Sequence, residues 1–332
     1  MRRAKWALIS AVIPAAFITM TGCAGSPHDP NEKYIMVVDN SKIPYFQTAA
    51  KGLFQATSEM KVRGEVQGPD GHDPKGEHEA FQRAIAEKPS GILVSVTDAS
   101  LLTPDINSAL SQGIPVLTID SDAPDSQRLF FVGTDNYNAG MAGGKMTAKL
   151  LNGKGNVVVF TIPTQGNLKD RLQGYETAFA DTGIKITQVV DMNGNSDIAF
   201  DTAKKLLDSK AKVDAFVCLE ALSCPAVADV VNRSGMSGKV VIVAMDTDPG
   251  TVDWINKGVI SATIAQKPWT MAYYGTKLVD DLHHHPPKPL ANNWAQNVTS
   301  PIPTFVDTGS FIVNKGNVGS VTASQSSGGT GQ

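Results

Sequence analysis

The sequence predicts an α/β protein with two lobes, each built around a parallel sheet. From Tyr34 onward, short apolar runs alternate with helical patterns almost without interruption, which is typical of successive βαβ units. The runs at residues 92–94, 157–160 and 240–243 are continuously apolar, as strands buried on both faces are. Ten such strands exceed what one compact sheet needs at this chain length, so we expect two lobes.

The expected elements follow one another in a regular order. Strands are predicted at residues 34–39, 64–67, 91–96, 115–119, 130–133, 156–161, 185–190, 214–218, 240–244 and 260–264. Helices are predicted at residues 45–61, 75–88, 101–112, 137–151, 168–181, 199–209, 223–234, 250–257 and 268–284. The polar, low-complexity residues 319–332 predict a disordered tail.

Residues 1–22 have the pattern of a bacterial lipoprotein signal peptide. Three basic residues precede an apolar segment at 6–19, and small residues stand before Cys23, which resembles a lipobox. The apolar segment is short for a permanent membrane helix, which is the weaker interpretation. Cleavage would leave a lipidated Cys23 and a tether over residues 23–32, so we expect a soluble body anchored to a membrane outside the cytoplasm.

The net charge argues against nucleic acid as a partner. The formal charge is −3 for the whole chain, and loss of Arg2, Arg3 and Lys5 with the signal peptide takes it to −6. A mildly acidic body of this kind does not attract phosphate backbones or anionic membrane surfaces. We expect a monomer. Cys218 and Cys224 allow either a disulfide or two buried thiols, and their spacing is not a zinc pattern.

The stretch from Tyr34 to Phe46 predicts a buried strand, a polar loop and a helix start. Ligands of open α/β sheets bind at such corners. The glycines and lysine of a phosphate loop are missing, so the two aromatic residues Tyr45 and Phe46 favour a flat, partly apolar ligand. The alternative is that both rings only pack in the core.

Six motifs occur in a family-specific order. They are Pro44-Tyr45-Phe46, residues 113–120 ending in Asp120, Gly133-Thr134-Asp135-Asn136 followed by Gly140, residues 169–175 with Arg171 ahead of Gly174 and Tyr175, Ala244-Met245-Asp246, and residues 264–268 with Gln266 ahead of Pro268. Together they resemble the ribose/galactose-type periplasmic sugar-binding proteins, the soluble components of ABC importers, over about residues 33–318. The resemblance implies the type I periplasmic binding protein fold, with two Rossmann-like lobes joined by a three-strand hinge.

The resemblance also implies a set of ligand contacts. A monosaccharide offers vicinal hydroxyls and apolar C–H faces, which suit bidentate polar side chains and aromatic plates. The implied hydrogen-bonding residues are Asp120, Arg171, Asp246 and Gln266, and the implied plates are Tyr45 and Phe46. For the two aspartates the alternative is a helix cap or turn, and for Arg171 it is a surface salt bridge.

Departures from the family pattern concern the identity of the ligand. Ile43 stands where ribose-type members carry Asn, while Asn40 and Ser41 lie just upstream. Glu220 stands near the position of a family Asn-Asp pair, and Ser121 replaces an Arg. Asn40, Ser41 and Glu220 are therefore further candidate contacts, and the class of sugar stays open.

Chain crossings expected near 134–136, 265–267 and 296–300 divide the chain between the lobes. Residues 33–134 plus 267–296 would form the N-terminal lobe, and residues 135–266 plus 297–318 the C-terminal lobe.

An enzyme is disfavoured because no histidine stands at a strand end and no nucleophile-elbow motif occurs. No nucleotide-binding glycine motif follows a strand, so we expect no cofactor. We also expect no metal. His72-Asp73 with Glu77-His78-Glu79 fits a solvated loop entering a helix, and residues 283–285 fit an exposed helix end.

Three functions remain. The first is a sugar receptor that serves the permease and ATPase of an ABC importer. The second is a sensor that presents a sugar or sugar-like signal to a membrane receptor, and the third is an enzyme on the same fold. A DNA-binding regulator is excluded because an export signal occupies the place of its helix-turn-helix.

Overall fold

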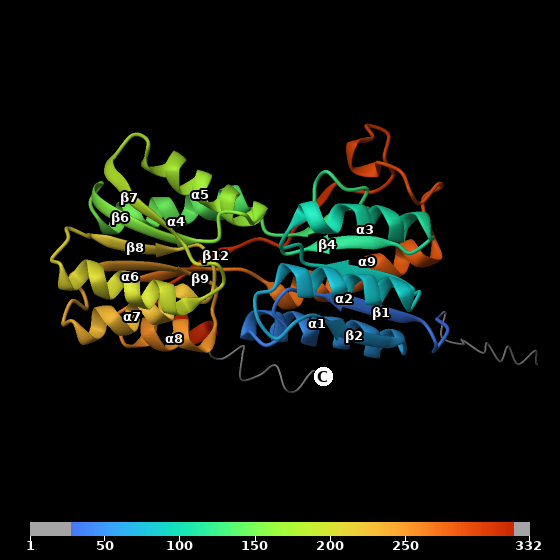
Figure 1. Cartoon of the computed structure of the whole chain (residues 1–332), viewed down its shortest axis with the longest axis horizontal. Coiled ribbons are helices and arrows are strands. Elements are labelled where there is room, and N and C mark those ends of the chain that lie inside the picture. Colours follow the sequence, from blue (N-terminus) through green and yellow to red (C-terminus); the bar gives the residue numbers. More distant parts are fainter. Residues whose placement is uncertain (1–27, 322–332) are drawn as a thin grey trace, which may run out of the picture.

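The computed structural model describes residues 28–321, which form two similar α/β lobes (Figure 1). The strands are β1 (Lys33–Val37), β2 (Arg63–Gln67), β3 (Gly91–Val94), β4 (Val116–Ile119), β5 (Phe131–Gly133), β6 (Lys154–Thr161), β7 (Gly183–Asp191), β8 (Ala215–Cys218), β9 (Val241–Met245), β10 (Ala262–Ala265), β11 (Phe305–Asp307) and β12 (Phe311–Val313). The helices are α1 (Pro44–Met60), α2 (Pro74–Ala86), α3 (Ala99–Ser111), α4 (Asn136–Leu150), α5 (Gly166–Phe179), α6 (Ser196–Asp208), α7 (Ser223–Arg233), α8 (Pro249–Asn256) and α9 (Pro268–His284), with a short 3-10 helix at Trp294–Gln296. The predicted fold class is confirmed.

The two sheets share one strand order. The N-terminal lobe has the order β11-β5-β4-β3-β1-β2, and the C-terminal lobe has β12-β10-β9-β8-β6-β7. All pairs are parallel except β10 with β12. Because crossovers between parallel strands are right-handed, α1 lies on the face opposite α2 and α3. Each sheet has a separate apolar core around its buried strands.

Close helix pairs flank both lobes because glycines remove side chains at the contacts. A Cβ at Gly52 of α1 would lie 2.3 Å from the carbonyl oxygen of Trp269 in α9. A Cβ at Gly140 of α4 would lie 2.1 Å from the carbonyl oxygen of Arg171 in α5. Gly140 therefore fixes the helix that carries Arg171 against α4.

The third crossing comes later than the sequence predicts. The edge strand β11 pairs with β5 in the N-terminal sheet, with Phe305 beside Phe131. The chain thus leaves the N-terminal lobe after Asp307 and joins the C-terminal sheet through β12. The expected crossing near 296–300 is wrong because a three-residue strand gives too weak a pattern to detect in sequence.

Both predicted ends of the folded body also shift. His28 and Glu32, within the expected tether at 23–32, pack against α9 through ion pairs with Asp280 and His284. Val321, within the expected tail, is buried against the C-terminal core. Residues 322–332 of the tail and the predicted signal peptide with Cys23 lie outside the described residues.

Candidate ligand-binding site between the lobes

A cavity of about 80 Å³ lies between the facing ends of the two lobes. The N-terminal lobe lines it with Asp39, Asn40, Ile43, Tyr45, Phe46, His72, Ser95, Thr97, Asp120 and Ser121, and the C-terminal lobe with Ile162, Gln165, Asn167, Leu168, Arg171, Gly194, Glu220, Ala221, Leu222, Asp246 and Gln266. Most of these residues follow the carboxyl ends of strands or begin helices, where ligands of such sheets bind. A single buried water needs roughly 10–15 Å³ of such cavity volume, so this cavity has room for a ligand the size of one sugar ring.

Eight of the nine side chains predicted as ligand contacts line this cavity. They are Asn40, Tyr45, Phe46, Asp120, Arg171, Glu220, Asp246 and Gln266. Ser41 does not line it, because its hydroxyl donates to Asp70 at 3.3 Å and its backbone N–H to the carbonyl of Pro69 at 2.8 Å. Ser41 therefore faces away from the cavity in this structure, and a contact between Ser41 and a ligand stays a prediction. Neighbouring residues of a loop point in different directions, and sequence spacing alone does not reveal which.

The wall from the N-terminal lobe is a hydrogen-bonded unit centred on Asp120. The Tyr45 hydroxyl donates to Oδ1 at 2.6 Å, and the Ser95 hydroxyl donates to Oδ2 at 2.8 Å. The Tyr45 and Phe46 rings pack edge to face with centroids 5.3 Å apart. Burial raises the pKa of the Asp120 carboxyl, and the bonds from Tyr45 and Ser95 oppose that rise. Each oxygen of Asp120 already has a protein donor.

Arg171 is the arginine that the C-terminal lobe contributes to the cavity wall, and its side chain is buried, with 3% of the residue exposed. Its guanidinium donates to the Asn136 side chain at 2.9 Å, to the Leu219 carbonyl at 2.7 Å and to the Gln266 side chain at 2.8 Å. All three acceptors are neutral, and no ion pair within 4.0 Å joins Arg171 to a carboxylate of residues 28–321. The alternative interpretation, in which Arg171 forms a surface salt bridge, is therefore wrong.

Asp246 lies beside Arg171 at the carboxyl end of β9. The Gln266 amide nitrogen donates to it at 3.2 Å and 3.4 Å, which is a weak contact. The pKa of Asp246 is raised to about 7, mainly by burial and also by the charges of Asp248 and Asp120, against the opposing effect of Arg171. This carboxyl keeps unused capacity to accept or donate hydrogen bonds at neutral pH.

Two of the cavity aspartates, Asp120 and Asp246, have left-handed backbones. Asp120 has φ 62° and Asp246 has φ 67°. They occupy matching places, because β4 and β9 hold the same position in the two sheets. Neither caps the following helix through its side chain, so the helix-cap alternative does not hold for them. Such a conformation costs a non-glycine residue roughly 1–3 kcal/mol and is frequent where the backbone must aim a side chain at a ligand.

Glu220 stands in a loop that a disulfide closes. Cys218 and Cys224 are joined, with Cα atoms 5.7 Å apart, which settles the two open alternatives for these cysteines. The Glu220 carboxylate accepts from the backbone N–H groups of Leu222 at 2.5 Å and Ser223 at 3.1 Å. It thus satisfies the start of α7, and burial raises its pKa to about 7.

His72 reaches the cavity from the loop before α2 and pairs with Asp39 at 2.7 Å. This hydrogen bond raises the pKa of His72. Glu77 in the same segment is fully buried and accepts from the backbone N–H of Thr97. The interpretation of this segment as solvated is therefore wrong for His72 and Glu77, whereas Asp73 and Glu79 are exposed and the segment enters α2 as predicted. His72 and Asp39 are site residues that the sequence analysis missed, because only their long-range pairing identifies them.

The same histidine contacts the opposite lobe. A Cβ at Gly194, in the loop after β7, would lie 2.3 Å from the Cβ of His72. Gly194 also has φ +70°, a conformation that suits glycine. The two lobes therefore approach each other closely at this edge of the cavity, and only glycine fits there.

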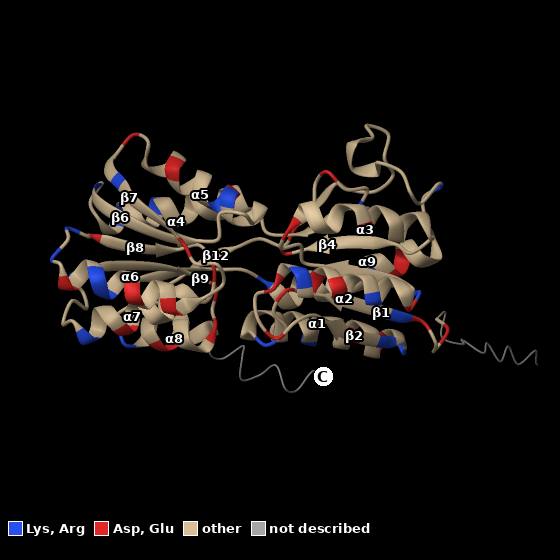
Figure 2. Cartoon of the chain, viewed as in Figure 1, with Lys and Arg blue, Asp and Glu red and all other residues tan. Residues whose placement is uncertain are grey.

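The polar groups of the cavity match a small polyhydroxylated ligand. The guanidinium and amides donate, the carboxyls accept, and the two aromatic rings offer apolar surface. Figure 2 shows both acidic and basic residues at the facing ends of the lobes, and the cavity lining itself has four carboxyl groups beside one arginine and one histidine. The arrangement favours a neutral ligand with several hydroxyls over an anion.

The family of the chain follows from comparisons with known proteins. Residues 34–284 match the model of the periplasmic binding protein domain, and the chain belongs to this family. The ribose/galactose-type resemblance of the six motifs is confirmed. Membership of this family implies a location outside the cytoplasm. The relatives named below are sugar-binding proteins, not enzymes.

Named relatives cover most of the chain. The ribose import binding protein of Bacillus subtilis is 21% identical over 83% of this chain and 93% of its own length. The D-allose-binding periplasmic protein of Escherichia coli is 24% identical over 75% of this chain and 84% of its own length. A sugar-binding protein of a sugar ABC transporter from Bacillus halodurans has a crystal structure with 35% identity, covering 87% of this chain and 99% of its own, with a TM-score of 0.76.

No helix within residues 28–321 is both long enough and apolar enough to cross a membrane.

Proposed function

We propose that this chain captures one monosaccharide in the cavity between its lobes, closes around it and delivers it to the permease and ATPase of an ABC importer. The observation that carries the proposal is the meeting of Arg171, Asp246, Gln266, Asp120 and the Tyr45–Phe46 pair at one cavity. The relatives that bind ribose or D-allose by name support the same class of ligand.

Closure of the lobes would let a partner protein distinguish the sugar-bound form from the free form. The cavity takes contacts from both lobes, so a sugar that touches both stabilises the closed arrangement. A permease that recognises only the closed form would then bind the receptor only when sugar fills the cavity. We further propose that Cys23 carries the lipid that keeps the receptor at the membrane, and that the receptor acts as a monomer.

A thermal-shift screen against pentoses, hexoses and polyols tests the sugar assignment. A true ligand raises the melting temperature because it binds only the folded state, and a hundredfold excess over Kd adds about 2.7 kcal/mol of stability. A neutral disaccharide too large for the cavity serves as the control. No shift with any monosaccharide at millimolar concentration would contradict the proposal.

The same cavity would also serve a sensor, and the genes beside this one distinguish the two roles. An ATPase and a permease favour import, whereas a kinase or chemoreceptor favours presentation of the sugar to a membrane receptor.

A further inference from the structure

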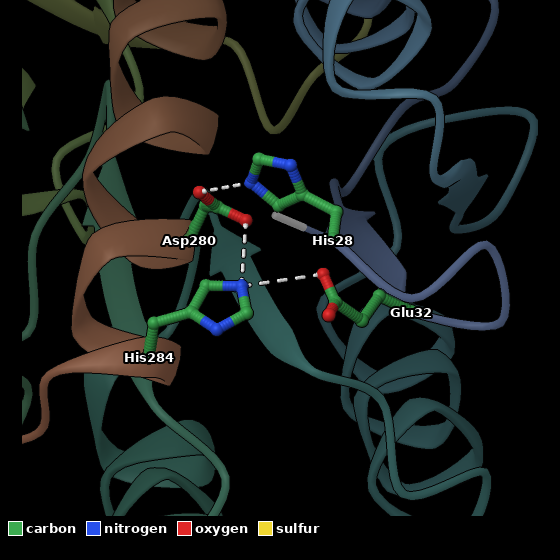
Figure 3. Close-up of side chains that lie close together, drawn as sticks. All are labelled: His28, Glu32, Asp280 and His284. Carbon is green, nitrogen blue, oxygen red and sulfur yellow. Dashed lines mark hydrogen bonds and ion pairs between the residues drawn. The ribbon is translucent and has the colours of Figure 1, made fainter. Parts of the chain in front are cut away.

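Four potential metal ligands meet at the end of the N-terminal lobe that faces away from the cavity. His28 and Glu32 lie in the segment before β1, and Asp280 and His284 lie in the last turns of α9 (Figure 3). One nitrogen or oxygen of each side chain lies within 4.8 Å of those of the other three. The cluster therefore joins two segments that are about 250 residues apart in the chain.

The distances within the cluster suit tetrahedral coordination. His28 Nε2 lies 3.0 Å from Asp280 Oδ2, His284 Nε2 lies 3.4 Å from Glu32 Oε2, and the four ligand atoms all lie within 4.8 Å of one another. A zinc ion bound at about 2.0–2.2 Å places its ligand atoms roughly 3.3–3.5 Å apart. Small movements of the four side chains would bring every ligand atom into range.

One oxygen of the cluster is buried without a hydrogen bond. The Glu32 side chain is 10% exposed, and its Oε2, which faces His284, has no hydrogen-bond partner. An unsatisfied buried carboxylate oxygen is costly, and a cation between Glu32 and the histidines would satisfy it.

Outer hydrogen bonds orient both carboxylates. The hydroxyl of Tyr34, which is fully buried, donates to Asp280 Oδ1 at 2.7 Å, and this leaves Oδ2 directed at His28. The backbone N–H of Asp29 donates to Glu32 Oε1 at 2.9 Å, and this leaves Oε2 directed at His284. Outer contacts of this kind are typical of metal ligands because they fix the direction of the lone pair that binds the metal.

We propose that His28, Glu32, Asp280 and His284 bind a divalent transition metal of the zinc class, which ties the segment before β1 to the end of α9. Two imidazole nitrogens and two carboxylate oxygens form a donor set that suits Zn²⁺. The same set disfavours Ca²⁺, which takes six to eight oxygen ligands. The site is separate from the sugar cavity and does not depend on the proposed function.

The experiment is a zinc titration of the chain prepared without a histidine tag and stripped of metal by a chelator. Calorimetry and competition with a chromophoric chelator should give one Zn²⁺ per chain. His28→Ala and Glu32→Gln should each weaken zinc binding at least about tenfold, because each removes a ligand. Zinc should raise the melting temperature of the parent by more than that of His28→Ala, with sugar binding unchanged.

The matched control is His285→Ala, which belongs to the same run of histidines as His284. The His285 side chain is 79% exposed and forms an ion pair with Asp281 in the preceding turn of α9. Its loss should change zinc affinity less than about twofold. Equal weakening by His285→Ala and His28→Ala would assign zinc to the exposed run and overturn the proposal. Absence of zinc binding at micromolar concentration would overturn it as well.

Discussion

The two lobes share a strand order but present different polar groups to the cavity. In the N-terminal lobe, Tyr45 and Ser95 donate to the two oxygens of Asp120 at 2.6 Å and 2.8 Å. In the C-terminal lobe, the matching Asp246 has only the Gln266 amide, at 3.2 Å or more. One aspartate is satisfied within the protein, and the other is not.

From this difference we propose separate tasks for the two lobes in ligand binding. The N-terminal wall is preorganised and offers a ligand its aromatic rings and already oriented polar groups, which limits the ordering cost of binding. The C-terminal wall holds a buried guanidinium and a carboxyl with spare capacity, so a ligand gains most of its new hydrogen bonds there. We therefore expect affinity to depend more on the C-terminal lobe.

The largest expected effect comes from Arg171→Ala in the C-terminal wall. Loss of a buried, charged donor costs roughly 2–5 kcal/mol in a polar interface, so ligand affinity should fall at least about thirtyfold. Water from the adjoining cavity can replace the three lost hydrogen bonds, so the fold should lose less stability than affinity. Calorimetry with a sugar found in the screen measures the effect.

Arg128→Ala is the matched control in the other lobe. Arg128 is 4% exposed and forms a two-pronged ion pair with Asp122, outside the cavity. Its removal should lower the free energy of unfolding by about 3–5 kcal/mol, with affinity within a few-fold of the parent. Equal losses of affinity in both variants would refute the assignment of Arg171 to the site.

The second prediction contrasts Asp246→Asn with Asp120→Asn. The pKa of Asp246 is raised from 3.8 to about 7, so the folded state holds a proton that the unfolded state has released. Stability of the parent therefore falls as pH rises from about 4 to 7. The Asn variant lacks this loss. From pH 5 to pH 8 its stability relative to the parent should therefore rise by about 2–3 kcal/mol.

Asp120→Asn should be destabilising at pH 8, because the loss of a hydrogen-bond acceptor should outweigh the relief of the raised Asp120 pKa. Its amide nitrogen cannot accept a hydrogen bond, so either Tyr45 or Ser95 loses its acceptor, at a cost of roughly 1–3 kcal/mol. Denaturant melts of both variants at pH 5 and pH 8 measure the pair. Changes of the same sign at pH 8 would show that the two matching aspartates do not differ as described.

The smallest effect is expected from Gly194→Ala at the contact between the lobes. The new Cβ would lie 2.3 Å from His72, so the closed arrangement should weaken and affinity should fall about tenfold. Gly235→Ala is the control, because Gly235 has φ +65° but nothing within 4 Å of its Cβ. Both variants should lose similar stability from backbone strain, about 1–2 kcal/mol. A lower ligand affinity of Gly194→Ala than of Gly235→Ala would therefore be due to weaker closure of the lobes. The fluorescence of Trp269, which lies near the crossing at Gln266, provides a second measurement of closure.

Most elements could be predicted from the sequence because their signals are local. Buried parallel strands such as β3 and β8 are continuous apolar runs, and helix starts such as Pro44 and Pro268 are marked by proline. Residues at strand ends, including Asp120, Asp246 and Gln266, meet at one edge of a sheet whatever the details of the loops. Their common cavity follows from the topology.

The features missed in the sequence depend on contacts between distant segments. His72 is buried because Asp39 pairs with it, and Glu32 because α9 covers it. The short strand β11 is stabilised by β5 and not by its own pattern. A disulfide between Cys218 and Cys224 depends on whether β8 and α7 bring the two sulfurs together, which the six-residue separation leaves open.

The crossings between the lobes determine how the molecule can move. Two of them are bonded side by side: the Thr308 N–H and hydroxyl donate to the Gly133 carbonyl, and the Asp135 N–H donates to Asp307. Connections arranged in this way resist sliding and twisting but allow bending about one axis. Gln266 lies in the remaining crossing and also bonds Arg171 and Asp246. We therefore expect the lobes to move mainly by bending about these crossings, and we expect Gln266 to link that bending directly to the candidate site, because it lies in one crossing and bonds two residues of the site.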